Sequence, residues 1–153
     1  MQQRLQNFFP KAGHYPVFHR NIYNVHQRVA AAFRKGRAFL AGDSAHVNNP
    51  LGGLGLNFGI HDAVELADLL GKVMRGEAPA DTLDGYDRRR RPLNVEYVQQ
   101  QTVANKKRLE EKDPAVRERN DAALQATAAD PATHRAYLLR ASLIDAVRKA
   151  KTT

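Results

Sequence analysis

An apolar run that ends in a carboxylate is the first feature of this sequence that points to chemistry. Residues 37–42, RAFLAG, have the composition of a buried strand, and Asp43 follows them directly. In open α/β sheets, ligands bind at the carboxyl ends of the strands. We therefore expect the Asp43 carboxylate to lie at a ligand site, where it would accept hydrogen bonds from ligand hydroxyl groups.

A glycine-rich loop follows this carboxylate and leads into a helical pattern. The loop NNPLGGLG spans residues 48–55, with glycines at positions 52, 53 and 55. The first N–H groups of a helix lack intrahelical acceptors and carry the positive end of its dipole. Glycines also remove the Cβ atoms that would hold a flat ligand away from the backbone. Residues 53–57 are thus expected to stabilise an anionic atom of a ligand.

The elements around this loop are expected to be short strands and then helices. Residues 15–26 alternate loosely and contain β-branched and aromatic side chains, which predicts one or two short strands, and residues 27–33 predict a helical turn. After the loop, the helical period indicates a long helix. Its apolar stripe consists of Leu56, Ile60, Ala63, Ala67 and Leu70. Gly59 and the alanines of this helix would let another backbone come close.

The second half of the sequence predicts further helices. Two helical patterns, 82–91 and 93–111, are divided by Pro92, which kinks or restarts a helix because it donates no N–H. Asp113 and Asp130 each precede a proline, the pattern of an N-cap followed by the first helical residue. Residues 132–150 predict one last helix, whose apolar stripe should pack on another surface. The stripe consists of Tyr137, Leu138, Leu139, Leu143, Ile144 and Val147.

Composition sets the protein class. The 153 residues are 42% hydrophobic and 26% charged, which is ordinary for a globular protein. The sequence has no cysteine, so disulfides and thiol chemistry are excluded. No run approaches the roughly 20 apolar residues of a membrane span, and residues 1–13 lack a secretory core. We expect a cytoplasmic protein without membrane association.

The net charge of +8 does not favour a nucleic-acid partner. Basic and acidic residues are mixed along the chain, except for the four arginines at 88–91, which we expect to form a solvated or ion-paired face. The aromatic residues that accompany bases in single-strand grooves are missing. The histidines other than His46 lack metal-ligand spacing, so no metal site is expected.

Residues 36–70, GRAFLAGDSAHVNNPLGGLGLNFGIHDAVELADLL, resemble the second flavin-binding motif of FAD-dependent aromatic hydroxylases. These are the group A flavoprotein monooxygenases related to para-hydroxybenzoate hydroxylase. The matching positions are Gly42, Asp43, Ala45, His46, Pro50, Gly52, Gly53, Gly55, Asn57, Asp62 and Ala63. Flanking segments extend the resemblance over about residues 23–92.

The resemblance implies a fold and a set of site residues. The fold would be an α/β fragment, mostly helical: the C-terminal portion of a Rossmann-like FAD-binding domain, with one or two strands, a flavin-loop helix, a long kinked helix and C-terminal helices. Asp43 would bind the ribityl hydroxyls, and Pro50, the one catalytic candidate, would lie near the reacting edge of the flavin. Backbone N–H groups around Leu56 and Asn57 would face flavin N1 and O2. The full expected cofactor-binding set is Gly42, Asp43, Pro50, Gly52, Gly53, Leu54, Gly55, Leu56 and Asn57.

The resemblance also implies an oxidoreductase activity. In this family NADH or NADPH reduces the flavin, and one oxygen atom is transferred from O₂ to an aromatic substrate. His46 is expected to pack or to form a hydrogen bond rather than to carry a proton.

Three departures from the family pattern bear on the domain organisation. The sequence has no Gly-x-Gly-x-x-Gly fingerprint, its Asp84-Gly85 pair lies beyond the flavin loop, and Tyr86 is followed by Asp87 instead of Glu-Arg. We expect residues 1–26 to be a remnant of substrate-domain strands, 27–112 the C-terminal part of the FAD-binding domain, and 113–153 a helical tail. Such a chain would bind FAD poorly unless a complementing N-terminal chain or a homodimer completed the site.

Two other functions are compatible with parts of the sequence. The chain could be a non-catalytic helical assembly module that uses the apolar stripe of residues 132–150. FLAGDSAH also resembles the Gly-Asp-Ser block of esterases, with Ser44 as the nucleophile. That mechanism needs an Asp-x-x-His pair, and Asp130 and His134 are one residue too far apart.

Overall fold

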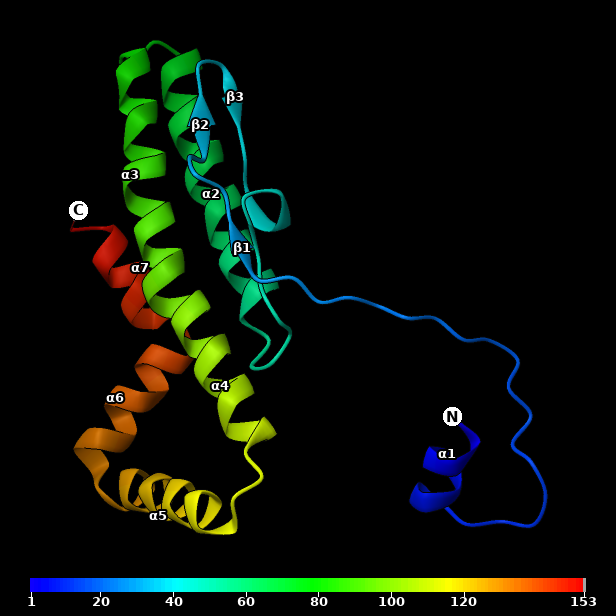
Figure 1. The fold of residues 1–153 in the computed structure, drawn as a ribbon. Coiled ribbons are helices and arrows are strands. Elements are labelled where there is room, and N and C mark those ends of the chain that lie inside the picture. Colours follow the sequence, from blue (N-terminus) through cyan, green and yellow to red (C-terminus); the bar gives the residue numbers. More distant parts are fainter. Residues whose placement is uncertain (153) are drawn as a thin grey trace.

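The computed structural model describes residues 1–152, and its main body is a pair of long helical segments that run side by side (Figure 1). The first is α2 (Leu54–Met74). A 3₁₀ turn, η2 (Ala80–Leu83), leads into the second, which we call the rod. The rod consists of α3 (Asp84–Leu93), the π-helix η3 (Asn94–Gln99) and α4 (Gln100–Glu110).

Four strands of two residues each lie along one side of α2 (Figure 1). β1 (Arg28–Val29) pairs antiparallel with β4 (His46–Val47). β2 (Arg34–Lys35) pairs antiparallel with β3 (Ala38–Phe39). Between β3 and β4 lies the 3₁₀ turn η1 (Gly42–Ser44). The strands serve to hold this turn and the loop after it against α2.

The remaining helices lie at the two ends of the chain. α5 (Pro114–Ala129) and α6 (Pro131–Ala141) extend from the end of the rod, and α7 (Ile144–Ala150) returns to pack beside α3 (Figure 1). α1 (Gln2–Phe8), which the sequence patterns did not predict, stands apart from the body at the far end of an extended segment (Figure 1).

Two apolar clusters form the core. One joins the strand side to α2 and α3 through Phe33, Ala45, Leu69, Leu83 and Tyr86. The other joins α2, the rod and α7. Its members are Leu54, Phe58, Leu93, Tyr97, Val98, Leu143 and Ala146. Because α2 contributes to both clusters, its position is fixed from both sides.

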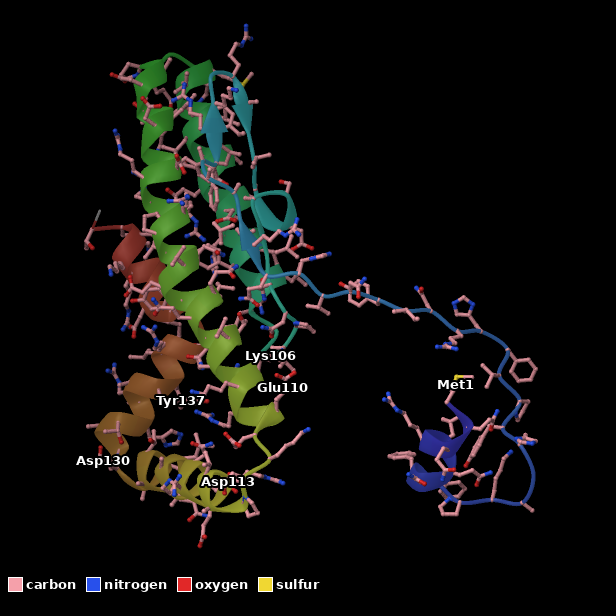
Figure 2. The ribbon with its side chains drawn as sticks, viewed as in Figure 1. Met1, Lys106, Glu110, Asp113, Asp130 and Tyr137 are labelled. Atoms are coloured by element: carbon pink, nitrogen blue, oxygen red, sulfur yellow. The ribbon has the colours of Figure 1, made fainter. Side chains whose placement is uncertain are left out.

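The predicted N-caps are confirmed. The Asp113 carboxylate accepts a hydrogen bond from the Ala115 N–H at 2.9 Å, and Asp130 accepts one from the Thr133 N–H at 2.7 Å. Both aspartates lie where their helices begin (Figure 2). The Thr133 N–H bond lowers the pKa of the Asp130 carboxyl group, because it stabilises the charged form.

The strand predictions before the loop are wrong in detail. Residues 15–26 are extended but form no strand within the described chain, and Phe18 and Ile22 are 95% and 74% exposed. An extended segment needs a neighbour that satisfies its N–H and C=O groups, and none of the described strands lies beside it. Residues 27–33 form β1 and a loop instead of a helical turn, and residues 37–42 contain only the short β3 instead of a buried strand.

The predicted apolar face of α2 is also corrected. Leu56 and Ile60 are 76% and 51% exposed, whereas Phe58 and Asp62 on another face are fully buried. Phe58 is the larger apolar side chain. Asp62 is buried because it pairs with Arg90, which lies 28 residues further along the sequence. The close approach expected at Gly59 does occur, and its partner is Gly42.

The two predictions for the later helices differ in outcome. After Pro92 the helical ladder changes to the π-helix η3, so the long helix continues with an altered hydrogen-bond register. The single helix predicted over 132–150 is wrong: it divides at Leu143, which has a φ of 63° and is 1% exposed. Burying Leu143 against the rod requires the chain to turn there, and this burial outweighs the left-handed backbone.

Candidate functional site

The η1 turn presents Asp43 beside α2. Gly42 lies so close to the second turn of α2 that a Cβ on Gly59 would come within 3.0 Å of the Gly42 Cα. The Gly42 N–H donates to Asp62 Oδ2 at 3.2 Å, and the Ser44 hydroxyl closes the turn by donating to the Ala41 carbonyl at 2.7 Å. The Asp43 side chain is exposed and makes no hydrogen bond within residues 1–152. Its carboxylate is thus available to a ligand.

The flavin loop, which we define as residues 48–53, approaches α2 through a tight turn. The Gly53 N–H donates to the Pro50 carbonyl at 3.0 Å. Gly52 has a φ of 108°, and a Cβ there would lie 2.8 Å from Asn105 Nδ2. Only glycine suits both the backbone conformation and the space at this position. Pro50 is exposed at the tip of this turn.

The N-terminus of α2 offers unused hydrogen-bond donors. In the described chain no side chain caps Gly53, and the first turn holds no acidic residue. By helix geometry the N–H groups of Leu54, Gly55 and Leu56 lack intrahelical acceptors. These donors lie at the positive end of a 21-residue helix. The arrangement suits an anionic or electron-rich ligand atom.

The side chains of this first turn point in different directions. Leu54 is buried in the core, Leu56 is 76% exposed, and the Asn57 amide donates to the Gly53 carbonyl at 2.9 Å. Leu54 therefore anchors the helix start in the core. The sequence-predicted residues 42–43 and 50–57 thus gather on α2 and the two turns before it.

A buried ionic cluster centred on Asp62 holds η1 in place against α2. Asp62 is 0% exposed, its Oδ1 accepts from Arg90 Nε at 2.6 Å, and its Oδ2 lies 2.5 Å from His46 Nε2. The Arg90 guanidinium also lies 4.1 Å from the centre of the Phe58 ring. Since Asp62 also accepts the Gly42 N–H, the cluster ties η1 to α2 and α3.

The cluster refines two expectations from the sequence. His46 is 1% exposed and bonded to Asp62, as expected for a hydrogen-bonding residue. The arginine run is ion-paired as expected at Arg89, which bonds Glu65 at 2.7 Å, and at Arg90. Arg90, however, is 2% exposed rather than solvated, because Asp62 compensates its charge inside the core.

Burial shifts two pKa values near the site. Burial raises the pKa of the Tyr86 phenol well above its usual range, and the nearby Asp62 acts in the same direction. The Tyr86 hydroxyl donates to the Leu40 carbonyl at 2.9 Å, which fixes the chain just before η1. Burial, followed by Arg90, lowers the pKa of His61 on α2.

The esterase arrangement is not assembled. The Ser44 hydroxyl bonds the Ala41 carbonyl, and within residues 1–152 it has no histidine partner. Asp130 caps α6 (Figure 2), and His134 lies within that helix by its position in the sequence. Without a base, Ser44 is not activated as a nucleophile.

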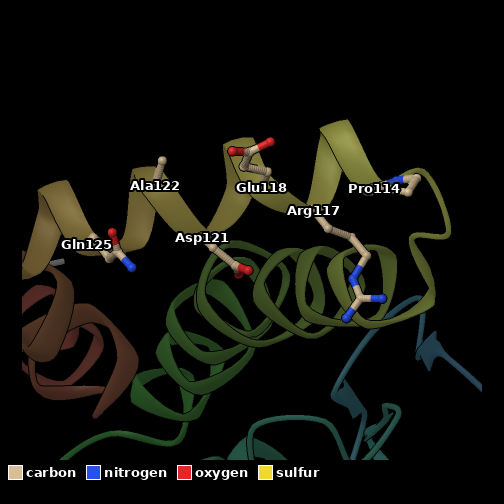
Figure 3. Close-up of a pocket in the computed structure, with 6 residues that line it drawn as sticks. All are labelled: Pro114, Arg117, Glu118, Asp121, Ala122 and Gln125. Atoms are coloured by element: carbon tan, nitrogen blue, oxygen red, sulfur yellow. The ribbon is translucent and has the colours of Figure 1, made fainter.

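The surface of α5 offers no comparable site. The hollow in Figure 3 is lined by Pro114, Arg117, Glu118, Asp121, Ala122 and Gln125, all from α5. A surface formed by one helix encloses no ligand. Among residues 1–152 no group of three or more His, Cys, Asp or Glu side chains could hold a metal ion. No helix there is both long and apolar enough to cross a membrane.

Sequence patterns missed a set of polar residues that hold the flavin loop. Gln27, Asn49 and Asn105 bond one another or the loop backbone, and Thr102 and Gln99 join them from the rod. Their sequence separations reach 75 residues. Amide side chains carry no periodic signal, so only the three-dimensional structure could bring these residues together.

Comparison with known proteins identifies a family for this chain. The family described as FAD binding domain matches residues 1–101. The para-nitrophenol 4-monooxygenase of Pseudomonas sp. (strain WBC-3) is 44% identical over 137 residues, which are 90% of this chain and 34% of that protein. The chain thus spans about a third of the length of this relative.

Solved structures show the same fold. The crystal structure of p-nitrophenol 4-monooxygenase PnpA from Pseudomonas putida DLL-E4 matches with a TM-score of 0.76 and 40% identity, covering 92% of this chain and 37% of that one. OxyS anhydrotetracycline hydroxylase from Streptomyces rimosus matches with a TM-score of 0.69 and 35% identity, over 78% and 24% of the two chains. The resemblance inferred from the flavin motif is confirmed, since these relatives are monooxygenases, and the chain belongs to the FAD binding domain family.

Proposed function

We propose that this chain supplies the flavin-ring side of the FAD site of an aromatic-ring monooxygenase. The observation that carries the proposal is that α2 begins with unused backbone N–H groups at Leu54 to Leu56, while its second turn packs against η1, the turn that contains the exposed Asp43. A bound flavin would accept a hydride from NADH or NADPH and deliver one oxygen atom of O₂ to an aromatic ring.

The residues of this chain have separate roles in the proposal. Asp43 accepts hydrogen bonds from the ribityl hydroxyls, and the N–H groups from Leu54 towards Asn57 donate to the edge of the flavin that gains negative charge on reduction. Gly53, where a Cβ would meet no atom within 4 Å, leaves the backbone open to the ring, whereas a Cβ at Gly52 or Gly55 would come within 2.8 Å of Asn105 Nδ2 or Asn48 Oδ1. Pro50 would lie near the reacting edge of the ring, as the family resemblance implies.

The proposal extends to the substrate, the partners and the location. A phenolic ring is the substrate class that the name of the para-nitrophenol 4-monooxygenase suggests. The adenosine side of FAD would be bound by a complementing N-terminal chain or by a second copy. Residues 1–26, 27–112 and 113–153 would serve as substrate-domain remnant, FAD-binding part and tail, in the cytoplasm.

The test is a titration of the chain with FAD, followed by flavin fluorescence. We expect weak binding, and we expect Asp43→Ala to lower the affinity about 10-fold or more, since a hydrogen bond to a charged group contributes about 1.5–3 kcal/mol. The matched control is Asp121→Ala, which removes an exposed carboxylate on α5 and should leave the affinity unchanged. Absence of binding at millimolar FAD, or equal affinity of the wild type and Asp43→Ala, would refute the proposal.

A further inference from the structure

The flavin loop is held from behind by five polar residues, which we call the anchoring cluster: Gln27, Asn49, Gln99, Thr102 and Asn105. They come from three separate segments, namely the residue before β1, the loop itself and the rod. Thr102 is 0%, Asn49 4% and Gln99 9% exposed. Hydrogen bonds in such a buried place are strong, and an unpaired member would be costly.

Asn49 is the member that belongs to the loop. Its Oδ1 accepts the Leu51 N–H at 3.1 Å, while its Nδ2 donates to Gln27 Oε1 at 2.7 Å and to the Thr102 carbonyl at 3.1 Å. Both amide protons and the carbonyl oxygen are therefore used. A flipped amide would direct its NH₂ group at the Leu51 N–H, so the orientation is determined by the backbone of the loop.

Gln27 connects the loop to the rod. Its Oε1 accepts from Asn49 twice, from Nδ2 and from the backbone N–H at 3.1 Å. Its Nε2 donates to Gln99 Oε1 at 2.7 Å and to Thr102 Oγ1 at 2.8 Å. The Thr102 hydroxyl donates its own proton to the Val98 carbonyl at 2.8 Å, so it is free to accept from Gln27.

Asn105 holds the other side of the same residue. Its Nδ2 donates to the Leu51 carbonyl at 3.1 Å. Leu51 is thus held at its N–H by Asn49 and at its C=O by Asn105, immediately before Gly52 with its positive φ. Gln99 and Thr102 lie at and just after the π-helix, whose wider turn changes the faces that the following helix presents.

We propose that Gln27 and Asn49 are positioning residues of the flavin site. They fix the Leu51 peptide, and through it the turn at residues 50–53 and the first N–H groups of α2, before any ligand binds. Preorganised donors cost no rearrangement on binding, so the cluster raises the affinity for the electron-rich edge of the flavin without touching it. The effect on flavin rests on the function proposed above, whereas the effect on the loop does not.

Amide hydrogen exchange of the full chain, followed by NMR, tests the effect on the loop. We expect Asn49→Ala and Gln27→Ala to speed exchange of the Leu51 and Gly53 N–H groups about 10-fold or more, while the Leu69 N–H in the middle of α2 stays protected. The control is Gln100→Ala, which removes an exposed amide next to Gln99 and should change none of these rates. Unchanged exchange at Leu51 and Gly53 in both folded variants would overturn the inference.

A further variant covers the case in which Asn49→Ala and Gln27→Ala do not fold. Asn105→Ala removes the hydrogen bond to the Leu51 carbonyl and leaves Gln27 and Asn49 in place. In this variant we expect faster exchange at the Gly53 N–H, because the turn loses one of the two side-chain hydrogen bonds that fix Leu51. Unchanged exchange at Gly53 would again contradict the inference.

FAD titration of the same variants separates the two proposals. We expect about 10-fold weaker binding in each single variant, and no additional loss in the double variant, because Gln27 and Asn49 bond each other and hold the same turn. A loop that loosens in a protein that binds no FAD would support the positioning role and refute the flavin function. Unchanged exchange together with unchanged FAD affinity would refute the positioning role alone.

Discussion

The body around α2 and the C-terminal arm of α5 and α6 are stabilised in different ways. The body buries charged and polar side chains, among them Asp62, Arg90 and Thr102. In the described chain α5 and α6 bury none of their own residues, and each begins at a capping aspartate. The body is thus specified by contacts between distant segments and the arm by local ones, which places the rigid part of the molecule around the flavin loop.

The largest loss of stability is expected when the buried ion pair between Asp62 and Arg90, which joins α2 to α3, is broken. Asp62→Ala removes the carboxylate 2.6 Å from Arg90, which is 2% exposed, and leaves it only the more distant Glu65 at 3.8 Å. Breaking a buried ion pair by removing one partner costs about 3–5 kcal/mol, because the remaining charge is uncompensated. Urea unfolding of the purified variant measures this loss in the free energy of unfolding.

The matched control for this prediction is Asp68→Ala, on the same helix. Asp68 pairs with Lys72 at 2.7 Å, and both side chains are about half exposed. An exposed pair contributes at most about 1 kcal/mol. If Asp62→Ala lost no more stability than Asp68→Ala, the buried cluster would not be what holds η1 to α2.

An intermediate effect is expected at Tyr86, with a distinct pH dependence. Tyr86→Phe removes the hydrogen bond to the Leu40 carbonyl and should cost about 1 kcal/mol at pH 7. Burial raises the pKa of this phenol in the folded state, so its contribution to stability is fully present below the unfolded pKa of about 10 and is lost as the pH rises above it.

Unfolding free energies between pH 7 and pH 11 test this prediction. The wild type should lose more stability above pH 10 than Tyr86→Phe does. Tyr137→Phe, at a tyrosine that is 40% exposed on α6, serves as the control and should behave like the wild type. Parallel pH profiles for all three proteins would show that Tyr86 ionises as freely in the folded state as in the unfolded one.

The smallest effect is expected in the arm. Asp113→Ala removes the side-chain cap of α5 and should cost about 1 kcal/mol of local helix stability, seen as faster amide exchange in the first turn of α5 only. Asp121→Ala, in the middle of the same helix, should leave that turn protected. Faster exchange in α2 after Asp113→Ala would mean that the arm and the body are coupled after all.

The same contrast explains what the sequence could predict. The caps at Asp113 and Asp130 were predictable because each acceptor and donor lie within three residues. The flavin motif was recognisable because its glycines and its aspartate stand at fixed spacings within one short segment. Both are local signals, and the structure places these residues at the expected helix starts.

The predictions from the sequence are wrong where contacts between distant segments determine which residues are buried. The stripe of Leu56 and Ile60 has regular apolar spacing, yet α2 buries Asp62, whose partner Arg90 lies 28 residues away. Gln27 and Thr102, separated by 75 residues, carry no pattern that would have joined them. The turn at Leu143 depends on the rod against which that side chain packs.

The most direct test of the account is an NMR titration of the ¹⁵N-labelled chain with FAD. We expect chemical-shift changes at the backbone amides of Gly42, Asp43 and residues 52–57, with those of α5 and α6 unchanged. Such a pattern would place the flavin on the two turns before α2 and on its first residues. Changes spread over α5 and α6, or none at residues 52–57 at millimolar FAD, would contradict it.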